Sequence, residues 1–294
     1  MRNLIRIGAF AFCAIGAFGQ SLSPVRNPSG VRLVVADQKA PTLSVILPGA
    51  PDNDRSIEVI FPEHVTARLH GNTEAEHLYL FTSPDNRPTW HQGGSSLEYE
   101  MNFKDGIHFL ARATLQDDGV LFHYEFTNGS QKAYDMIYAV TDPRLTGIFH
   151  DVRLESTYVH HKQGFELLAS ETPDRLAMPL DRWLPSRYLA SYTWPVRPKR
   201  VERRDDGITY YNKSQPVDEP MVATFSTDRK WVVASFSRTT GNVWSNPELT
   251  CQHVDPVTPL PPGAKASLEV KLLVFRGTLE DALGKVRAQR ESLK

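Results

Sequence analysis

Cysteine is scarce in this chain of 294 residues, which contains only two. Cys13 lies in an apolar N-terminal stretch, so a chain that loses this stretch keeps Cys251 alone. A single cysteine cannot form an internal disulfide, and the stability of the fold must then come from its hydrophobic core. With 40% hydrophobic residues, the chain is long enough to bury a large core.

An excess of charge of either sign is also lacking, because 33 basic residues are balanced by 34 acidic ones. Proteins that bind nucleic acid or anionic membranes present a basic surface, which this balance does not indicate. The sequence has no glycine-rich phosphate loop and no Gly-x-Ser-x-Gly elbow. We therefore expect a neutral or weakly charged ligand, no nucleic-acid partner and no cofactor; the oligomeric state stays open.

Long apolar runs are absent except at the N-terminus, where Arg2 and Arg6 precede the apolar stretch 7–18. Ala17 and Gly19 are small residues at the positions that a signal peptidase reads. No other run is long enough to span a bilayer, so the mature chain has no expected membrane span. We predict a signal peptide at 1–19, a linker at 20–30, a single domain at 31–294 and a secreted or periplasmic protein.

Residues 107–140 show the clearest pattern in the chain. Apolar residues occupy every second position from Ile107 to Leu115 and again from Val120 to Phe126. A period of two is typical of strands with one buried face. The stretch is therefore interpreted as three consecutive antiparallel strands, and the alternation leaves a second face for polar side chains.

The turn between the first two of these strands has two possible positions. The dipeptide at 118–119 is Asp-Gly, a strong hairpin signal that would bring Arg112 opposite Glu125. A turn centred on 117–118 would instead bring Arg112 opposite His123. In either register, one polar face carries His108, Arg112, His123 and Glu125.

The rest of the chain consists mainly of short strand-like runs separated by Pro, Gly, Asn and Asp. The proline content of 173–198 and the turn-rich composition of 201–220 predict irregular structure there. One helix is expected near the C-terminus, with Thr278 as its cap and Asp281 as an acidic partner in the first turn. This pattern predicts an all-β fold, a large antiparallel β-sandwich with a short C-terminal helix.

Two segments carry a resemblance to a known superfamily. Residues 117–130, D-D-G-V-L-F-H-Y-E-F-T-N-G-S, resemble a strand-turn pattern of the galactose-mutarotase-like proteins, the superfamily of the aldose epimerases. Residues 251–256, followed by a Pro-Pro-Gly turn and a long strand, resemble the last catalytic strand of that family. The resemblance spans the layout of residues 100–275 and implies a mutarotase-like supersandwich that holds a sugar in a concave cleft. The superfamily also contains domains of glycoside hydrolases and polysaccharide lyases, so the fold does not fix the reaction.

The sequence departs from the family pattern at two positions. Asp142 precedes Pro143 where the epimerases have a His-Pro pair, and His253 stands where they have a general-base Glu. The resemblance therefore implies His253 as the base, since an imidazole can take a proton from an anomeric hydroxyl. Asp255 or Glu125 would orient or assist it. The further expected roles are a second acid/base for His150 or His160 and ligand binding for Arg112 and His123.

Each group of candidate residues also has a purely structural interpretation. The polar face of the hairpin is either a salt-bridged surface or the floor of a sugar groove. The His-rich stretch 150–161 contains metal-ligand residue types, but their spacing matches no metal template, and we expect no metal site. Aromatic residues either fill the core or stack on sugar rings. The tryptophans proposed as ligand contacts are Trp90, Trp194 and Trp244.

These observations predict an exported protein that binds or processes carbohydrate, with a sugar or polysaccharide as its ligand. If it is an enzyme, the residues permit epimerase-, lyase- or hydrolase-type acid/base chemistry. The alternative is a non-catalytic module that binds a glycan or a protein and in which the His residues are structural. An enzyme needs several titratable groups to converge in one concave site, whereas a binding module does not.

Overall fold

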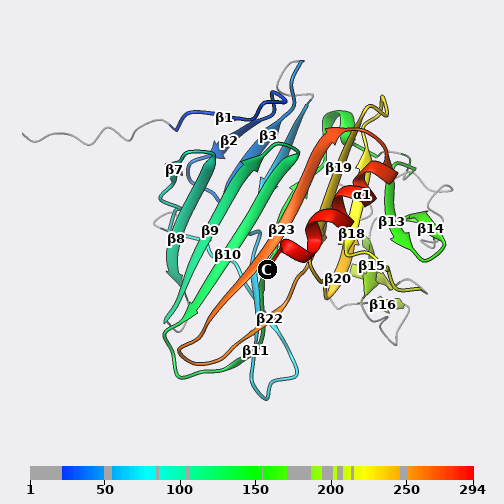
Figure 1. Ribbon diagram of the computed structural model, residues 1–294. Coiled ribbons are helices and arrows are strands. Elements are labelled where there is room, and N and C mark those ends of the chain that lie inside the picture. The colour runs from blue at the N-terminus through cyan, green and yellow to red at the C-terminus, as the bar shows by residue number, and fades with distance from the viewer. Residues whose placement is uncertain are drawn as a thin grey trace, which may run out of the picture.

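The computed structural model describes residues 22–49, 55–83, 86–103, 106–151, 153, 155–170, 187–193, 201–203, 208–212, 215–245 and 251–294. One layer is a nine-stranded sheet (Figure 1). Its strands, in spatial order, are β14 (Gly164–Leu167), β13 (Thr157–His161), β18 (Met221–Phe225), β19 (Trp231–Ser237), β23 (Lys265–Arg276), β10 (Gly119–Asn128), β9 (Ile107–Gln116), β8 (Ser96–Phe103) and β7 (His91–Gly93).

The opposing layer contains two five-stranded sheets that meet edge to edge. The first is β1 (Val25–Arg26), β2 (Arg32–Asp37), β3 (Thr42–Ile46), β4 (Ser56–Ile60) and β12 (Asp142–Arg144). The second is β16 (Val201–Arg203), β17 (Ile208–Asn212), β15 (Arg187–Thr193), β20 (Asn242–Ser245) and β21 (Gln252–Val254). The two sheets join through one antiparallel bridge, between Arg144 of β12 and Cys251, the residue before β21.

A four-stranded sheet forms the lower end of the molecule in Figure 1. It consists of β22 (Thr258–Leu260), β11 (Tyr134–Ala139), β5 (Val65–Leu69) and β6 (Glu76–Leu78). Among the described strands, β15 and β17 form a parallel pair and the other ladders are antiparallel. The predicted large antiparallel β-sandwich is confirmed.

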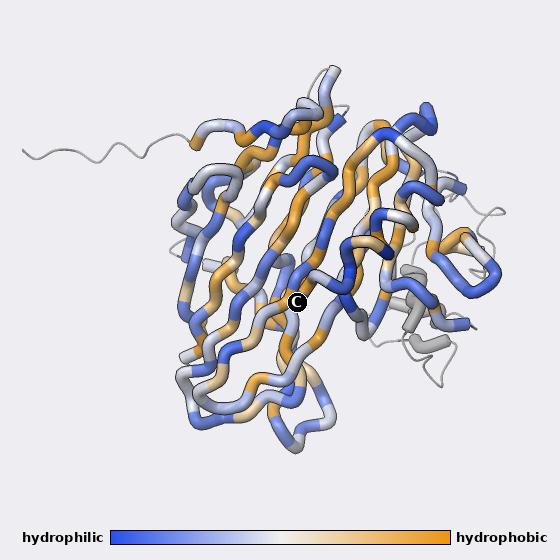
Figure 2. The backbone as a smooth tube through the Cα atoms, in the orientation of Figure 1, coloured by the Kyte–Doolittle hydropathy of each residue, from blue (hydrophilic) through white to orange (hydrophobic). Residues whose placement is uncertain are grey.

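The core lies between the layers and is built by the alternation seen in the sequence. Every second side chain of β9 and β10 is buried, and the hydropathy of these strands alternates along the tube in Figure 2. Phe61, just after β4, reaches across to this sheet, and its ring centroid lies 5.2 Å from that of Phe122. Tyr99 from β8 donates a hydrogen bond to the Phe61 carbonyl at 2.5 Å, so a buried hydroxyl is satisfied.

A second, smaller core lies on the outer side of the nine-stranded sheet, under α1 (Leu279–Gln289) (Figure 1). Thr278 caps this helix, and its side chain and that of Asp281 exchange hydrogen bonds with each other's backbone N–H groups. Leu279, Ala282 and Val286 are the buried residues of the helix. The predicted helix and its cap are confirmed, and the helices in the described part of the chain include none long and apolar enough to cross a membrane.

The hairpin register follows the second of the two expected alternatives. Arg112 lies opposite His123, so the turn is centred on 117–118 and the pairing of Arg112 with Glu125 is wrong. The reason is Gly119, which belongs to β10 at φ +150°. A Cβ atom there would lie 2.0 Å from the carbonyl oxygen of Leu272 on β23, so glycine is needed for a close approach between strands and not for the turn.

Two further expectations need correction. The third strand of residues 107–140, β11, does not stay beside β10 but pairs with β5 and β22 in the four-stranded sheet. Residues 187–193, 201–203 and 208–212 form β15, β16 and β17, so the prediction of irregular structure is wrong for these residues. The prolines at 185 and 195 flank β15 without interrupting it, which explains how a proline-rich region accommodates a strand.

Candidate functional site

The candidate site lies at the seam where β12 meets β21. The bridge between Arg144 and Cys251 is antiparallel, and side chains on a strand alternate between its two faces. Positions two residues away from the bridge therefore project from the same face as the bridge residues. This places Asp142 beside Arg144 and His253 beside Cys251, so four polar side chains share one face at the junction.

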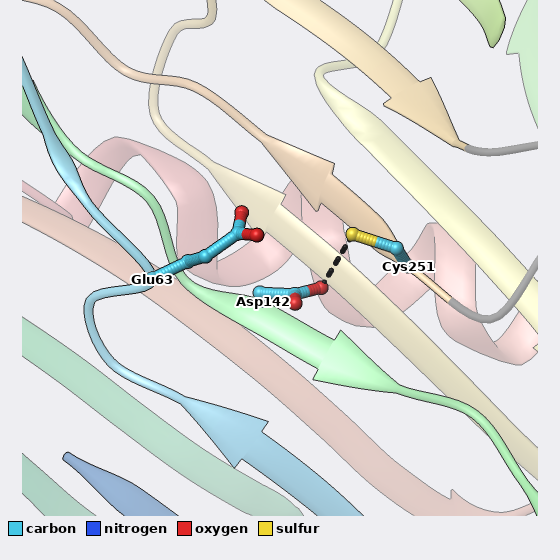
Figure 3. Close-up of side chains that lie close together, drawn as sticks. All are labelled: Glu63, Asp142 and Cys251. Carbon is cyan, nitrogen blue, oxygen red and sulfur yellow. Dashed lines mark hydrogen bonds between the residues drawn. The ribbon is translucent and has the colours of Figure 1, made fainter. Parts of the chain in front are cut away.

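Asp142 is the most enclosed of these groups, with a side chain 0% exposed. The Cys251 thiol donates to its Oδ1 at 2.7 Å (Figure 3). Nε of Arg144 donates to its Oδ2 at 3.2 Å. Burial raises the pKa of the Asp142 carboxyl, and the thiol and the nearby cations only partly oppose this. Burial and the adjacent carboxyl also raise the pKa of the Cys251 thiol, which therefore keeps its proton and acts as a donor.

Glu63 points toward this pair from the turn between β4 and β5 (Figure 3). Its backbone N–H donates to the Val140 carbonyl at 2.9 Å, and its carboxylate lies 3.5 Å from Nδ1 of His64. The His64 imidazole lowers the pKa of Glu63, although burial opposes the effect. Two neighbouring carboxyl groups therefore have their pKa values pushed in opposite directions, with Asp142 raised and Glu63 lowered, an arrangement typical of acid/base sites.

The donor atoms of Glu63, Asp142 and Cys251 lie within 4.8 Å of one another, and these residue types can bind a metal ion. A cysteine ligand must be a thiolate. Here the thiol is already hydrogen-bonded to Asp142, and the pKa of the thiol is raised. The geometry therefore describes a hydrogen-bonded carboxyl and thiol cluster, and we do not assign a metal to it.

His253 lies on β21, two residues after Cys251, and is 1% exposed. Its Nδ1 atom is 2.6 Å from Oδ1 of Asp255, while Nε2 is buried and has no hydrogen-bond partner within the described ranges. Burial lowers the pKa of His253, but Asp255, Asp142 and Glu63 outweigh it and raise the pKa above its ordinary value. Because Nδ1–H donates to a carboxylate, the neutral ring presents the lone pair of Nε2 as a base.

The surroundings of His253 hold the ring in place. The Trp244 ring from β20 packs edge-on against it, with centroids 3.9 Å apart. On the opposite face of β21, Gln252 accepts from Thr224 at 2.8 Å and donates to Thr157 at 3.2 Å, and the two threonine hydroxyls are 2.9 Å apart. This buried ring of hydrogen bonds ties β21 to β13 and β18, so the strand that carries His253 is fixed to the other layer.

The polar face of the hairpin lies elsewhere, on the side of the nine-stranded sheet that faces away from the main core. Each of its residues has a partner on its own sheet. Arg112 pairs with Glu98 at 2.5 Å, His123 with Glu269 at 2.9 Å and Glu125 with Lys265 at 3.1 Å. The structure thus brings His253 and Asp255 together and leaves Arg112, His123 and Glu125 in ion pairs of their own.

The other predicted residues also have defined positions. His150 is exposed after the 3₁₀ turn Gly147–Phe149, and Nδ1 of His160 lies 2.6 Å from Asp218. Trp90 is half-buried, with ring centroids 5.7 Å from Phe61 and 5.1 Å from Tyr99, so it packs on the core. Trp194 lies outside the described residues. Of the two tryptophans that the structure describes here, Trp244 contacts His253.

Sequence reasoning did not select Glu63, Asp142, Arg144 or Cys251 as site residues. Asp142 and Cys251 lie in segments that the superfamily resemblance singles out. The resemblance could therefore have indicated that both lie near His253. Glu63 has no comparable signal. It reaches the site because the turn after Phe61 pairs with the chain entering β12, a contact between residues far apart in the sequence.

Comparisons with known proteins identify structural relatives only. No protein-family model and no curated protein matches the chain. A galactose mutarotase related enzyme from Lactobacillus acidophilus is 13% identical and aligns over 87% of this chain and 98% of its own, with a TM-score of 0.48. A putative aldose 1-epimerase from Escherichia coli K12 is 12% identical over 86% and 98%, with a TM-score of 0.47. An alpha-N-acetylgalactosaminidase from Bifidobacterium bifidum is 10% identical over 92% of this chain and 39% of its own, with a TM-score of 0.48.

The first two of these structures are named for the superfamily that the sequence resembles, and the third is a glycosidase. The chain thus has galactose-mutarotase-like structural neighbours. The reaction has to be argued from the residues at the seam.

Proposed function

We propose that this protein binds and processes carbohydrate at the seam between β12 and β21, with His253 as the general base. The observation that carries the proposal is the buried His253–Asp255 pair, which fixes Nδ1 as a donor and leaves Nε2 as an acceptor without a partner in the described chain. The superfamily resemblance of residues 117–130 and 251–256 supports a sugar as the ligand.

Two groups with different acidity can serve the two proton transfers of such chemistry. Nε2 of His253 takes a proton from the sugar, either from a hydroxyl or from a carbon beside a carboxylate. Asp142, whose pKa is raised by burial, is the group that we assign to return a proton to the departing oxygen. Glu63 stays ionised, because its pKa is lowered, and can stabilise positive charge that develops on the sugar.

The reaction class is tested by incubating the full chain with neutral sugars, oligosaccharides and uronic-acid polysaccharides. Anomer exchange is followed by NMR, elimination by ultraviolet absorbance and hydrolysis by new reducing ends. One of these signals is expected in the wild type, and it falls by about 10²-fold or more in His253→Ala. The matched control is His123→Ala, which removes an imidazole paired with Glu269 on the outer face and should leave turnover unchanged.

Equal turnover in wild type and His253→Ala would remove His253 as the base. Binding of a sugar without any turnover would instead identify a glycan-binding module. The absence of both binding and turnover across the panel would reject a carbohydrate function.

We also propose that the protein is exported and acts as one domain. Arg2, Arg6 and the apolar stretch 7–18 support removal of residues 1–19. Mass spectrometry of the protein recovered from the periplasm or medium should give a mature chain that begins at Gln20. A cytosolic chain that retains Met1 would contradict this part of the proposal.

A further inference from the structure

Tyr79, just after β6, carries a large aromatic side chain that the fold does not bury. It is 58% exposed and, together with Val257 at 41%, makes up the exposed large apolar residues of the described chain. An exposed aromatic ring at a fixed position is a common contact for the flat apolar face of a ligand, because it loses little conformational freedom on binding.

The Tyr79 ring is supported from one side by an imidazole. The ring centroids of Tyr79 and His64 are 5.4 Å apart, with the planes tilted by 46°. His64 in turn meets His77 edge-on at 4.8 Å, and Nδ1 of His77 lies 2.9 Å from the Thr66 hydroxyl. The three rings form a continuous strip, here called the aromatic strip, whose far end is hydrogen-bonded to β5.

The aromatic strip adjoins the candidate site. His64 follows Glu63 in sequence, and its Nδ1 lies 3.5 Å from the Glu63 carboxylate. The same carboxylate belongs to the cluster with Asp142 and Cys251. A ligand bound at the seam and extending past Glu63 therefore meets His64 and the strip next.

The chemistry around the strip favours a neutral, hydroxyl-rich partner. Glu63 is ionised, as its lowered pKa indicates, and an anionic sugar here would meet a like charge. Charged residues are depleted from the cores of protein–protein interfaces, which makes a strip beside Glu63 and the exposed Glu76 a poor protein contact. Carboxylates and imidazoles do suit the hydroxyl groups at the edge of a stacked pyranose.

We propose that Tyr79, supported by His64, forms a second sugar-ring subsite, so that the ligand is a neutral oligosaccharide of at least two units. One ring occupies the seam at His253 and the next stacks on Tyr79. This inference rests on the proposed function, because it takes the seam to be the site of the first ring.

The test is isothermal titration of the full chain with neutral monosaccharides and with the corresponding disaccharides and longer oligosaccharides. The wild type should bind the disaccharide more tightly than the monosaccharide. Tyr79→Ala should weaken disaccharide binding by about tenfold and leave monosaccharide binding unchanged, whereas Tyr79→Phe should retain most of the affinity. The matched control is Val257→Ala, which removes the other exposed apolar side chain and should change neither affinity.

Several outcomes overturn the inference. Unchanged disaccharide affinity in Tyr79→Ala excludes the subsite, and an equal loss in Tyr79→Ala and Tyr79→Phe shows a hydroxyl contact in place of ring stacking. Tighter binding of uronic-acid oligosaccharides than of neutral ones rejects the ligand class. The proposed function stands in these cases if His253→Ala still abolishes turnover, and it falls separately if the wild type neither binds nor converts any sugar.

Discussion

His253 on β21 and Asp255, just after this strand, are joined by a 2.6 Å contact between Nδ1 and Oδ1, and both side chains are buried. The carboxylate fixes which ring nitrogen carries the proton and raises the pKa of the imidazole against the effect of burial. A hydrogen bond of this kind determines both the orientation and the protonation state of a catalytic histidine.

Asp255→Asn should therefore lower turnover and shift its pH dependence. The base form of His253 is needed, so the rate falls as the pH drops through the His253 pKa. Removing the Asp255 charge lowers that pKa, and the acid limb of the pH–rate profile should move to lower pH while the plateau falls by about 10²-fold or more. Kinetics across a pH series measure both effects. As a control, Asp151→Asn removes a carboxylate that bonds the backbone N–H groups of Glu155 and Ser156, and should leave the acid limb in place.

The raised thiol pKa of Cys251 makes its reactivity a second test. A thiol alkylates or exchanges as the thiolate, and burial together with the Asp142 carboxyl disfavours that form. In the native protein at mildly alkaline pH, a disulfide reagent should react with Cys251 roughly tenfold or more slowly than with free glutathione. Unfolding in denaturant should restore the ordinary rate. A fast reaction in the native state, lost in Cys251→Ala, would show that the thiol is exposed and not engaged by Asp142.

The sequence predicts those strands that have one buried face and one solvent-exposed face. In β10, Phe122 and Tyr124 alternate with His123 and Glu125, so the pattern gives both the element and its two faces. The same pattern could not fix the hairpin register, since a shift of the partner strand by two residues keeps every side chain on its own face. The decisive constraint, the approach of Gly119 to Leu272, comes from a strand far along the chain.

Only part of the candidate site, His253 and Asp255, could be predicted from the sequence. His253 and Asp255 are two residues apart, and in extended chain this spacing puts both side chains on one side. Their neighbours Asp142 and Glu63 come from other elements and arrive through a single bridge and a turn contact. The polar side chains of the hairpin gave an equally strong sequence signal, yet Arg112 and Glu125 form ion pairs with Glu98 and Lys265 on the outer face. Residue types alone do not distinguish a solvated ion pair from a functional cluster.

The attachment of the C-terminal helix to the hairpin gives a stability prediction. Asp118 accepts from Lys271 at 2.9 Å, from Gln289 at 2.8 Å and from Lys285 at 3.3 Å. Lys271 has a side chain only 1% exposed, so Asp118→Asn leaves a buried ammonium poorly compensated. We expect a loss of about 2–3 kcal/mol in the free energy of unfolding, measured by denaturant titration near neutral pH.

The pH dependence of this loss of stability follows from the direction in which folding shifts the pKa of Asp118. Burial raises the pKa of Asp118, but Lys271 and Gln289 outweigh it and hold the pKa below its ordinary value. Stability from this group is then fully present above the unfolded-state pKa of about 3.9 and is lost as the pH falls through the lower folded-state pKa. The difference in the free energy of unfolding between the wild type and Asp118→Asn should therefore become smaller at acid pH. Glu125→Gln, which breaks the exposed pair with Lys265 on the same two strands, should cost less than about 1 kcal/mol at any pH.

The close approach of β10 to β23 predicts that Gly119 tolerates no side chain. In Gly119→Ala, the new Cβ would lie 2.0 Å from the Leu272 carbonyl oxygen and 2.9 Å from the Leu273 Cα, and the residue would have to keep φ at +150°. The strands must separate at the centre of the nine-stranded sheet, so we expect a loss of about 3 kcal/mol or more in the free energy of unfolding. Gly93→Ala in the edge strand β7 is the matched control, because a Cβ there meets nothing within 4 Å and the loss should stay below about 1 kcal/mol. Equal unfolding midpoints for the two variants would contradict the strand spacing that sets the register of the hairpin.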